Sequence, residues 1–148
     1  MSDSQNVATQ TSGKLSDETR LELLTLANML LHSSYWFLCL SSCSTKLNLP
    51  GFAWATKEKE AKCKDAALMI FNMLNEKELS VDLADIAKPR FDESEISSEF
   101  ILARWNDVDD WLEKKIQDIK KKAILPASNM NLSSFLDDVT STINSVAK

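Results

Sequence analysis

The residues of this chain that could do chemistry are few: three cysteines and a single histidine. Cys39 and Cys43 are four residues apart, which places them on one helix face, and Cys63 could join them as a third soft metal ligand. A tetrahedral thiolate site needs four ligands, and no second cysteine or histidine pair completes it. We therefore favour reduced, buried cysteines that pack as small hydrophobic residues. His32 is left as a surface residue, an interface residue or a metal contact.

Motifs for the common enzyme chemistries are missing from the sequence. There is no glycine-rich phosphate loop, no serine in a nucleophile-elbow context and no second histidine to pair with a cysteine. The formal charge of −5, from 17 basic and 22 acidic residues, argues against nucleic acid as the main partner. The lysine runs at 57–64 and 114–122 are interleaved with acids or lie near a helix end, which is typical of solvated faces. We expect neither an enzyme nor a nucleic-acid-binding protein.

The composition predicts a single all-α domain. Two glycines and three prolines among 148 residues leave little turn chemistry for a sheet. Residues 1–14 are rich in Ser, Thr, Gln and Asn, so we expect a disordered tail there. The spacing of apolar residues predicts four helices, at 17–42, 52–78, 94–123 and 132–148, the first capped by Ser16 and the second opened by a Pro50-Gly51 turn.

The connections between these helices predict a four-helix bundle with one long crossover. The link between the first two helices is short, so they should be antiparallel neighbours, whereas the segment between the second and third must carry the chain back along the bundle. The second helix would be about 40 Å long and the fourth only about 25 Å, at ~1.5 Å per residue. The shortened fourth helix should therefore leave part of the bundle without a fourth wall.

The first predicted helix is apolar over most of its circumference, so it should be covered on two sides. The predicted core residues are Leu23, Leu26, Leu30, Phe37 and Leu38, whereas Leu24, Leu31, Tyr35 and Trp36 extend around the side. A deeply buried helix would explain this pattern. We favour a core face together with a subunit interface.

We expect a cytoplasmic protein. The N-terminus has neither a basic start nor an apolar signal core, and we expect no membrane-spanning segment. An odd number of cysteines within helical patterns fits reduced thiols in the cytosol.

Two stretches of this chain resemble the ferritin family. Leu49-Pro50-Gly51-Phe52-Ala53 with the charged helix after it, and Val81 to Pro89 (VDLADIAKP), are similar to the second helix and the long crossover of that family. The resemblance covers about residues 14–148 and is strongest over 33–89. It implies a ferritin-like four-helix bundle, and a two-fold dimer formed through the first two helices and the crossover segment. The family's short fifth helix, which builds the four-fold contacts of its 24-subunit shell, has no counterpart before Lys148.

The same resemblance implies that the di-iron oxidase centre of the family is lost. On the first helix, Leu30 stands where the family has a glutamate, and Phe37 stands where it has a tyrosine. On the second helix, Cys63 stands where the family has its bridging glutamate, and Ala66 where it has a histidine. An auxiliary glutamate falls on Lys62, and only the third-helix glutamate keeps a carboxylate, as Asp109. One carboxylate cannot hold two irons, so the resemblance implies a pseudoenzyme that is not a ferroxidase.

Weak residual iron contacts are expected at four carboxylates. On the surface that would line a ferritin cavity, Glu58 and Asp65 remain acidic while Ala61, Lys62 and Leu68 do not. At the three-fold channel, an aspartate and a glutamate of the family fall on Ser134 and Asp137. The expected metal contacts are therefore Asp109, Asp137, Glu58 and Asp65, with no resident cofactor.

Two functional hypotheses follow from these observations. The first is a catalytically inactive ferritin-like subunit related to iron storage, which forms a homo-oligomeric shell through its first two helices or joins a shell made with other ferritin subunits. The second is a structural or interaction protein that uses a ferritin-like dimer as a scaffold and has no role in iron. Neither hypothesis involves nucleic acid or a membrane.

Overall fold

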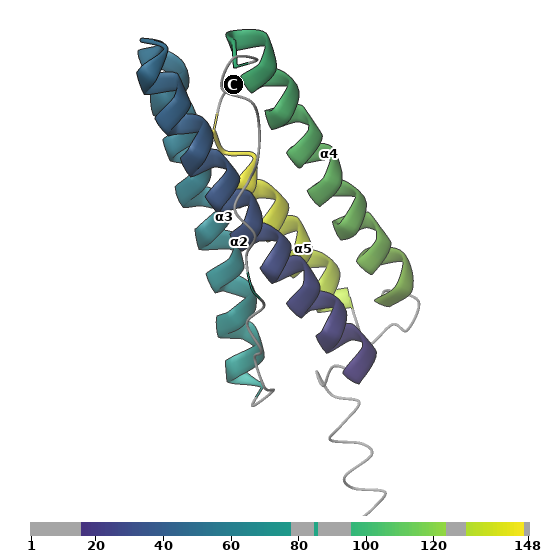
Figure 1. Ribbon diagram of the computed structural model, residues 1–148. Coiled ribbons are helices and arrows are strands. Elements are labelled where there is room, and N and C mark those ends of the chain that lie inside the picture. Colours follow the sequence, from purple (N-terminus) through teal and green to yellow (C-terminus); the bar gives the residue numbers. More distant parts are fainter. Residues whose placement is uncertain (1–15, 78–84, 86–95, 124–129, 147–148) are drawn as a thin grey trace, which may run out of the picture.

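The computed structural model describes residues 16–77, 85, 96–123 and 130–146 (Figure 1). These residues form four helices and no strand, namely α2 (Asp17–Lys46), α3 (Pro50–Glu76), α4 (Ser98–Ala123) and α5 (Met130–Ile143). The predicted all-α four-helix bundle is confirmed. The expected tail at 1–14 and nearly all of the Val81–Pro89 stretch lie outside the described residues.

The helices are arranged in a ring in which α2 packs on α3 and α4, and α5 completes the ring against α3 and α4. Figure 1 shows that α2 and α3 are antiparallel, whereas α3 and α4 run in the same direction. The chain between Glu76 and Ser98 therefore joins opposite ends of the bundle, as predicted for one long crossover. α5 has 14 residues where the other helices have 26 to 30, so the fourth wall is short.

The start of α2 is capped as the sequence predicts. The Ser16 hydroxyl accepts a hydrogen bond from the Thr19 backbone N–H at 3.1 Å, which satisfies one of the free donors of the first turn. The helix then continues to Lys46, four residues past its predicted end. It ends at a turn in which Asn48 adopts a left-handed conformation with φ of 58°.

Three other helix boundaries differ from the prediction. Pro50 belongs to the first turn of α3 and does not form a preceding turn, because the ring of proline presets a helical φ where no intrahelical N–H bond is needed. α4 begins at Ser98 and not at 94, after Ser97 accepts a hydrogen bond from the Phe100 N–H at 3.1 Å. α5 runs from Met130 to Ile143 instead of 132–148.

The core contains most of the apolar residues predicted for it. Leu23, Leu26, Leu30 and Phe37 of α2 are fully buried, but Leu38 is 49% exposed and was wrongly assigned to the core. Leu24, which was placed to the side, is 5% exposed. Leu24 and Leu38 are 14 residues apart and lie on nearly the same side of α2, so their different burial reflects their positions along the helix and not a different face.

Helix α2 is long and apolar enough to cross a membrane, by length and composition alone. The expectation that no segment of the chain spans a membrane stays a prediction. Half of the most apolar stretch of α2 is buried against the rest of the protein, and the core helix of a soluble bundle meets the same test. The cytoplasmic location stays a prediction.

Candidate functional site

The positions implied as iron ligands lie inside the bundle. Leu30 and Phe37 of α2, and Cys63 and Ala66 of α3, are all fully buried. Asp109 of α4 lies near enough for its charge to act on the Cys63 thiol. The bundle thus brings α2, α3 and α4 together at the level where the resemblance places a metal centre.

A lysine side chain occupies this level of the core. Lys59 of α3 is 1% exposed, and its ammonium lies 2.8 Å from the Asp109 carboxylate of α4. The ammonium also donates a hydrogen bond to the backbone carbonyl of Ile143 at 2.5 Å. Ile143 is the last residue of α5, where carbonyls lack partners within the helix and the helix dipole is negative. Lys59 therefore connects three helices of the bundle.

Aromatic rings surround the rest of the Lys59 ammonium. The nitrogen lies 5.6 Å from the centre of the Trp105 ring and 5.9 Å from that of Phe37. The two rings pack edge to face, with their centres 5.1 Å apart and an angle of 73° between their planes. Such rings attract a desolvated cation through their negative faces. The cation is therefore compensated by a carboxylate, a carbonyl and two aromatic faces.

Cys63 lies one helical turn after Lys59 and is also buried. Burial raises the pKa of the Cys63 thiol from 9.0 to about 12, while the Lys59 cation lowers this pKa and the Asp109 carboxylate raises it. The thiol is therefore protonated at neutral pH. Because the thiolate is the form that binds metals and attacks electrophiles, Cys63 behaves here as a small apolar residue.

The four predicted iron contacts do not converge on one site. Asp109 is paired with Lys59, and Asp137 of α5 is paired with Lys120 of α4. Glu58 is half-buried and Asp65 is exposed, both on α3. Within the part of the chain that the structure describes, no three His, Cys, Asp or Glu residues are grouped so that they could hold a metal ion. Weak iron contacts at single carboxylates stay a prediction.

The remaining candidate ligands are not arranged as a site either. Cys39 and Cys43 are half-buried, reduced cysteines on α2. His32 accepts a hydrogen bond from the Trp36 indole N–H at 2.9 Å, and its ring packs edge to face with Trp111 at 6.0 Å. His32 therefore helps to join α2 to α4 within the chain, and the three options left open for it stay predictions.

The sequence analysis missed the role of Lys59, which it grouped with the lysines of a solvated face. This assignment was wrong for Lys59. The signal was its position, because Lys59 falls four residues after Ala55 and four before Cys63, on the apolar stripe of its own helix. Lys57 and Lys64, in the same run, are exposed as predicted.

Comparison with known proteins gives no family assignment: the chain matches no family model and no curated protein sequence.

Proposed function

We propose that this chain is a ferritin-like subunit that has no oxidase activity and contributes to an oligomeric shell related to iron storage. The observation that carries the proposal is the buried pair of Lys59 and Asp109 at the centre of a bundle in which α3 and α4 are parallel. The parallel arrangement supports ferritin-like topology. The buried pair supports the loss of catalysis.

The charge of Lys59 and the apolar side chains near it would oppose a di-iron centre in this bundle. A di-iron centre gathers several carboxylates around two divalent cations inside a bundle. Here one ammonium takes the place of the metal charge and engages the Asp109 carboxylate, while Leu30 and Ala66 fill adjacent space with apolar atoms. A ferrous ion entering this level would meet a like charge, and the other carboxylate whose charge acts on Cys63, that of Glu60, accepts a hydrogen bond from Ser34 at 2.9 Å. An inactive subunit of this kind would form part of the oligomeric shell but would not oxidise iron.

We further propose that α2 and α3 form the contact between subunits. Leu31, Tyr35 and Leu38 recur at helical spacing on α2, and Leu38 is 49% exposed. On α3, Trp54 and Leu68 are 64% and 48% exposed. Exposed apolar stripes of this kind on neighbouring helices are typical of protein–protein contacts. The partner would be a second copy or another ferritin-like subunit.

The alternative function is an interaction scaffold that uses the same bundle without iron. The observation that favours it is the lack of a grouped metal-ligand set among the described residues. In this case the buried pair serves only to join α3, α4 and α5 in one arrangement.

Native mass separates the two functions. The purified full-length chain is incubated with ferrous iron, and its mass is measured by light scattering with the iron content read on the same peak. A species of many subunits that carries iron supports the shell. A monomer or dimer without iron refutes the shell and supports the scaffold.

A further inference from the structure

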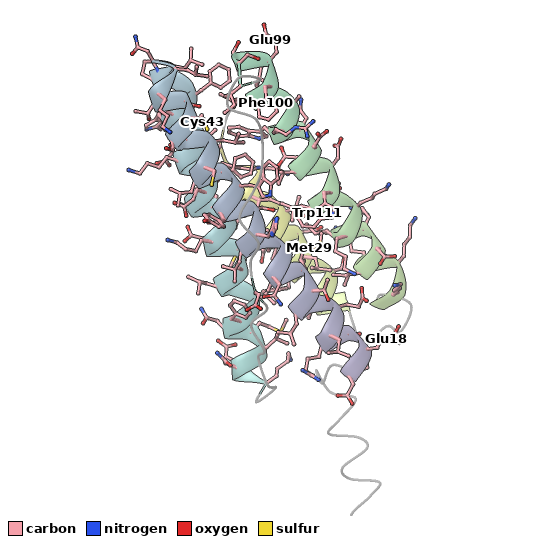
Figure 2. The ribbon with its side chains drawn as sticks, in the orientation of Figure 1. Glu18, Met29, Cys43, Glu99, Phe100 and Trp111 are labelled. Atoms are coloured by element: carbon pink, nitrogen blue, oxygen red, sulfur yellow. The ribbon has the colours of Figure 1, made fainter. Side chains whose placement is uncertain are left out.

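The surface between α2 and α4 is hollowed along its length. Two adjoining hollows, with volumes of about 400 and 540 Å³, share Trp111 of α4 as a common wall. The first extends to Arg104 and the second to Lys121, so together they follow α4 for about 26 Å at 1.5 Å per residue. Figure 2 shows Trp111 of α4 at the level of Met29 of α2, beside this groove.

One half of the groove is aromatic and held in place by its own contacts. Trp111 is 43% exposed, which is unusual for so large an apolar side chain. The Trp36 indole donates to His32 at 2.9 Å, and the His32 ring packs on Trp111 at 6.0 Å and 70°. The three rings are therefore positioned before any partner arrives, which lowers the entropic cost of binding.

The other half of the groove is basic. Lys114 and Lys121 line it, and within the described part of the chain neither residue forms an ion pair. Lys115, also in the lining, is engaged by Glu22 of α2 at 2.6 Å. The one carboxylate among the residues that line this hollow, Asp118, is paired with Lys122 at 3.2 Å. Lys114 and Lys121 therefore leave a local excess of positive charge on a protein whose formal net charge is −5. A partner with carboxylates would be attracted to this half of the groove and repelled by much of the remaining surface.

We propose that the α2–α4 groove binds an acidic peptide segment of a partner protein. An aromatic or large apolar side chain of the segment packs against Trp36 and Trp111, and its carboxylates pair with Lys114 and Lys121. The length of the groove suits several turns of a helix or a short extended strand, whereas a small molecule would fill only one hollow. The central, exposed tryptophan is the type of residue that supplies most of the binding energy at such surfaces. This proposal is independent of any role in iron.

A peptide selection tests the proposal. A random 12-residue phage library is selected on the immobilised full-length chain, and the most enriched peptide is synthesised for binding measurements by fluorescence anisotropy. We expect enriched peptides to combine one aromatic residue with several Asp or Glu. Trp111→Ala should weaken binding at least tenfold, and Lys114→Glu with Lys121→Glu should do the same and remove most of the salt dependence.

Matched controls lie on α3, away from the groove. Lys57→Glu, alone and together with Lys64→Glu, reverses exposed lysines that line neither hollow, so neither control should change the affinity. If Trp111→Ala lowers the melting temperature enough to compromise the fold, the charge-reversal variant decides the question.

Three results would overturn the proposal. The first is a selection that enriches no peptide, or only peptides without acidic residues. The second is an affinity that is the same for the groove variants and the α3 controls, and the third is a native mass that is lower for Trp111→Ala than for the wild type. The last result would assign the groove to a second copy of the chain.

Discussion

The ammonium of Lys59 lies 2.8 Å from the carboxylate of Asp109 inside the bundle, and it joins α3 to α4 where both helices face the core. Lys59 is 1% exposed, while the Asp109 side chain retains 20% exposure. The pair is therefore anchored by a fully desolvated cation. Such a cation is tolerated only while its partners remain in place.

Removing Asp109 should destabilise the protein strongly. Asp109→Ala leaves the Lys59 ammonium buried without its counter-ion, and we expect a loss of about 3 kcal/mol in the free energy of unfolding, measured by urea denaturation. Replacing both residues, as Lys59→Met with Asp109→Leu, should recover most of this loss because apolar side chains of similar volume carry no desolvation cost.

The matched control is the exposed pair of Lys122 and Asp118 on α4, 3.2 Å apart. Lys122→Met should change the unfolding free energy little, because solvent screens an exposed pair. If Asp109→Ala costs no more than Lys122→Met, the buried pair does not have the role given to it here.

The stability of the protein should fall with pH in alkaline solution because of Cys63. Burial raises the pKa of this thiol from 9.0 to about 12, so between these values the unfolded thiol releases its proton while the native thiol keeps it. The unfolded state then binds fewer protons, and the unfolding free energy should decrease with a limiting slope of about 1.4 kcal/mol per pH unit.

Cys63→Ala isolates this effect. The relevant quantity is the difference between the unfolding free energies of the wild type and of Cys63→Ala from pH 8 to 11, because it contains only the contribution of this thiol. We expect this difference to be constant up to about pH 9 and then to change steadily. Parallel curves throughout would show that the native thiol ionises as readily as the unfolded one.

Assembly and folding should depend on different residues. Leu38 is 49% exposed on α2, so Leu38→Asp should lower the native mass in light scattering without lowering the melting temperature of the subunit. Trp105 is 1% exposed and packs on Phe37, so Trp105→Ala should cost about 3–5 kcal/mol of stability. Loss of assembly in both variants with equal loss of stability would contradict the assignment of the two faces.

Trp36 was first placed with the side-facing residues of the first helix. In the structure Trp36 lines a hollow together with Trp111 of α4, and its indole N–H donates a hydrogen bond to His32 of its own helix. Leu38 is therefore the better residue for a test of subunit contact.

The number and order of the helices could be predicted from the sequence because each helix has a long apolar stripe at helical spacing. Leu23, Leu26 and Leu30 illustrate the pattern, and all three are buried. The ends were less predictable. Pro50 was assigned to a turn, because the sequence alone does not show whether a proline precedes a helix or occupies its first turn.

The contacts of Lys59 could not be predicted because its partners are distant in sequence. Asp109, which forms the ion pair, is on another helix, and Ile143, whose carbonyl accepts the hydrogen bond, lies 84 residues further along the chain. A lysine on an apolar stripe is usually expected to extend its ammonium to solvent. Here Trp105, Phe37 and Asp109 close over it from two neighbouring helices. Only the packing of three helices reveals that the charge stays inside.

The central claim is that the charge of Lys59 takes the place of iron in a ferritin-like bundle. Its most direct test is an anaerobic titration with Fe(II), followed by calorimetry, of a variant that restores the implied ligands: Leu30→Glu, Cys63→Glu and Ala66→His. We expect this triple variant to bind little iron, because the ammonium engages the carboxylates. Adding Lys59→Gln should release them and produce measurable binding. Equal binding with and without Lys59→Gln, or no binding in either variant while both remain folded, would contradict the claim.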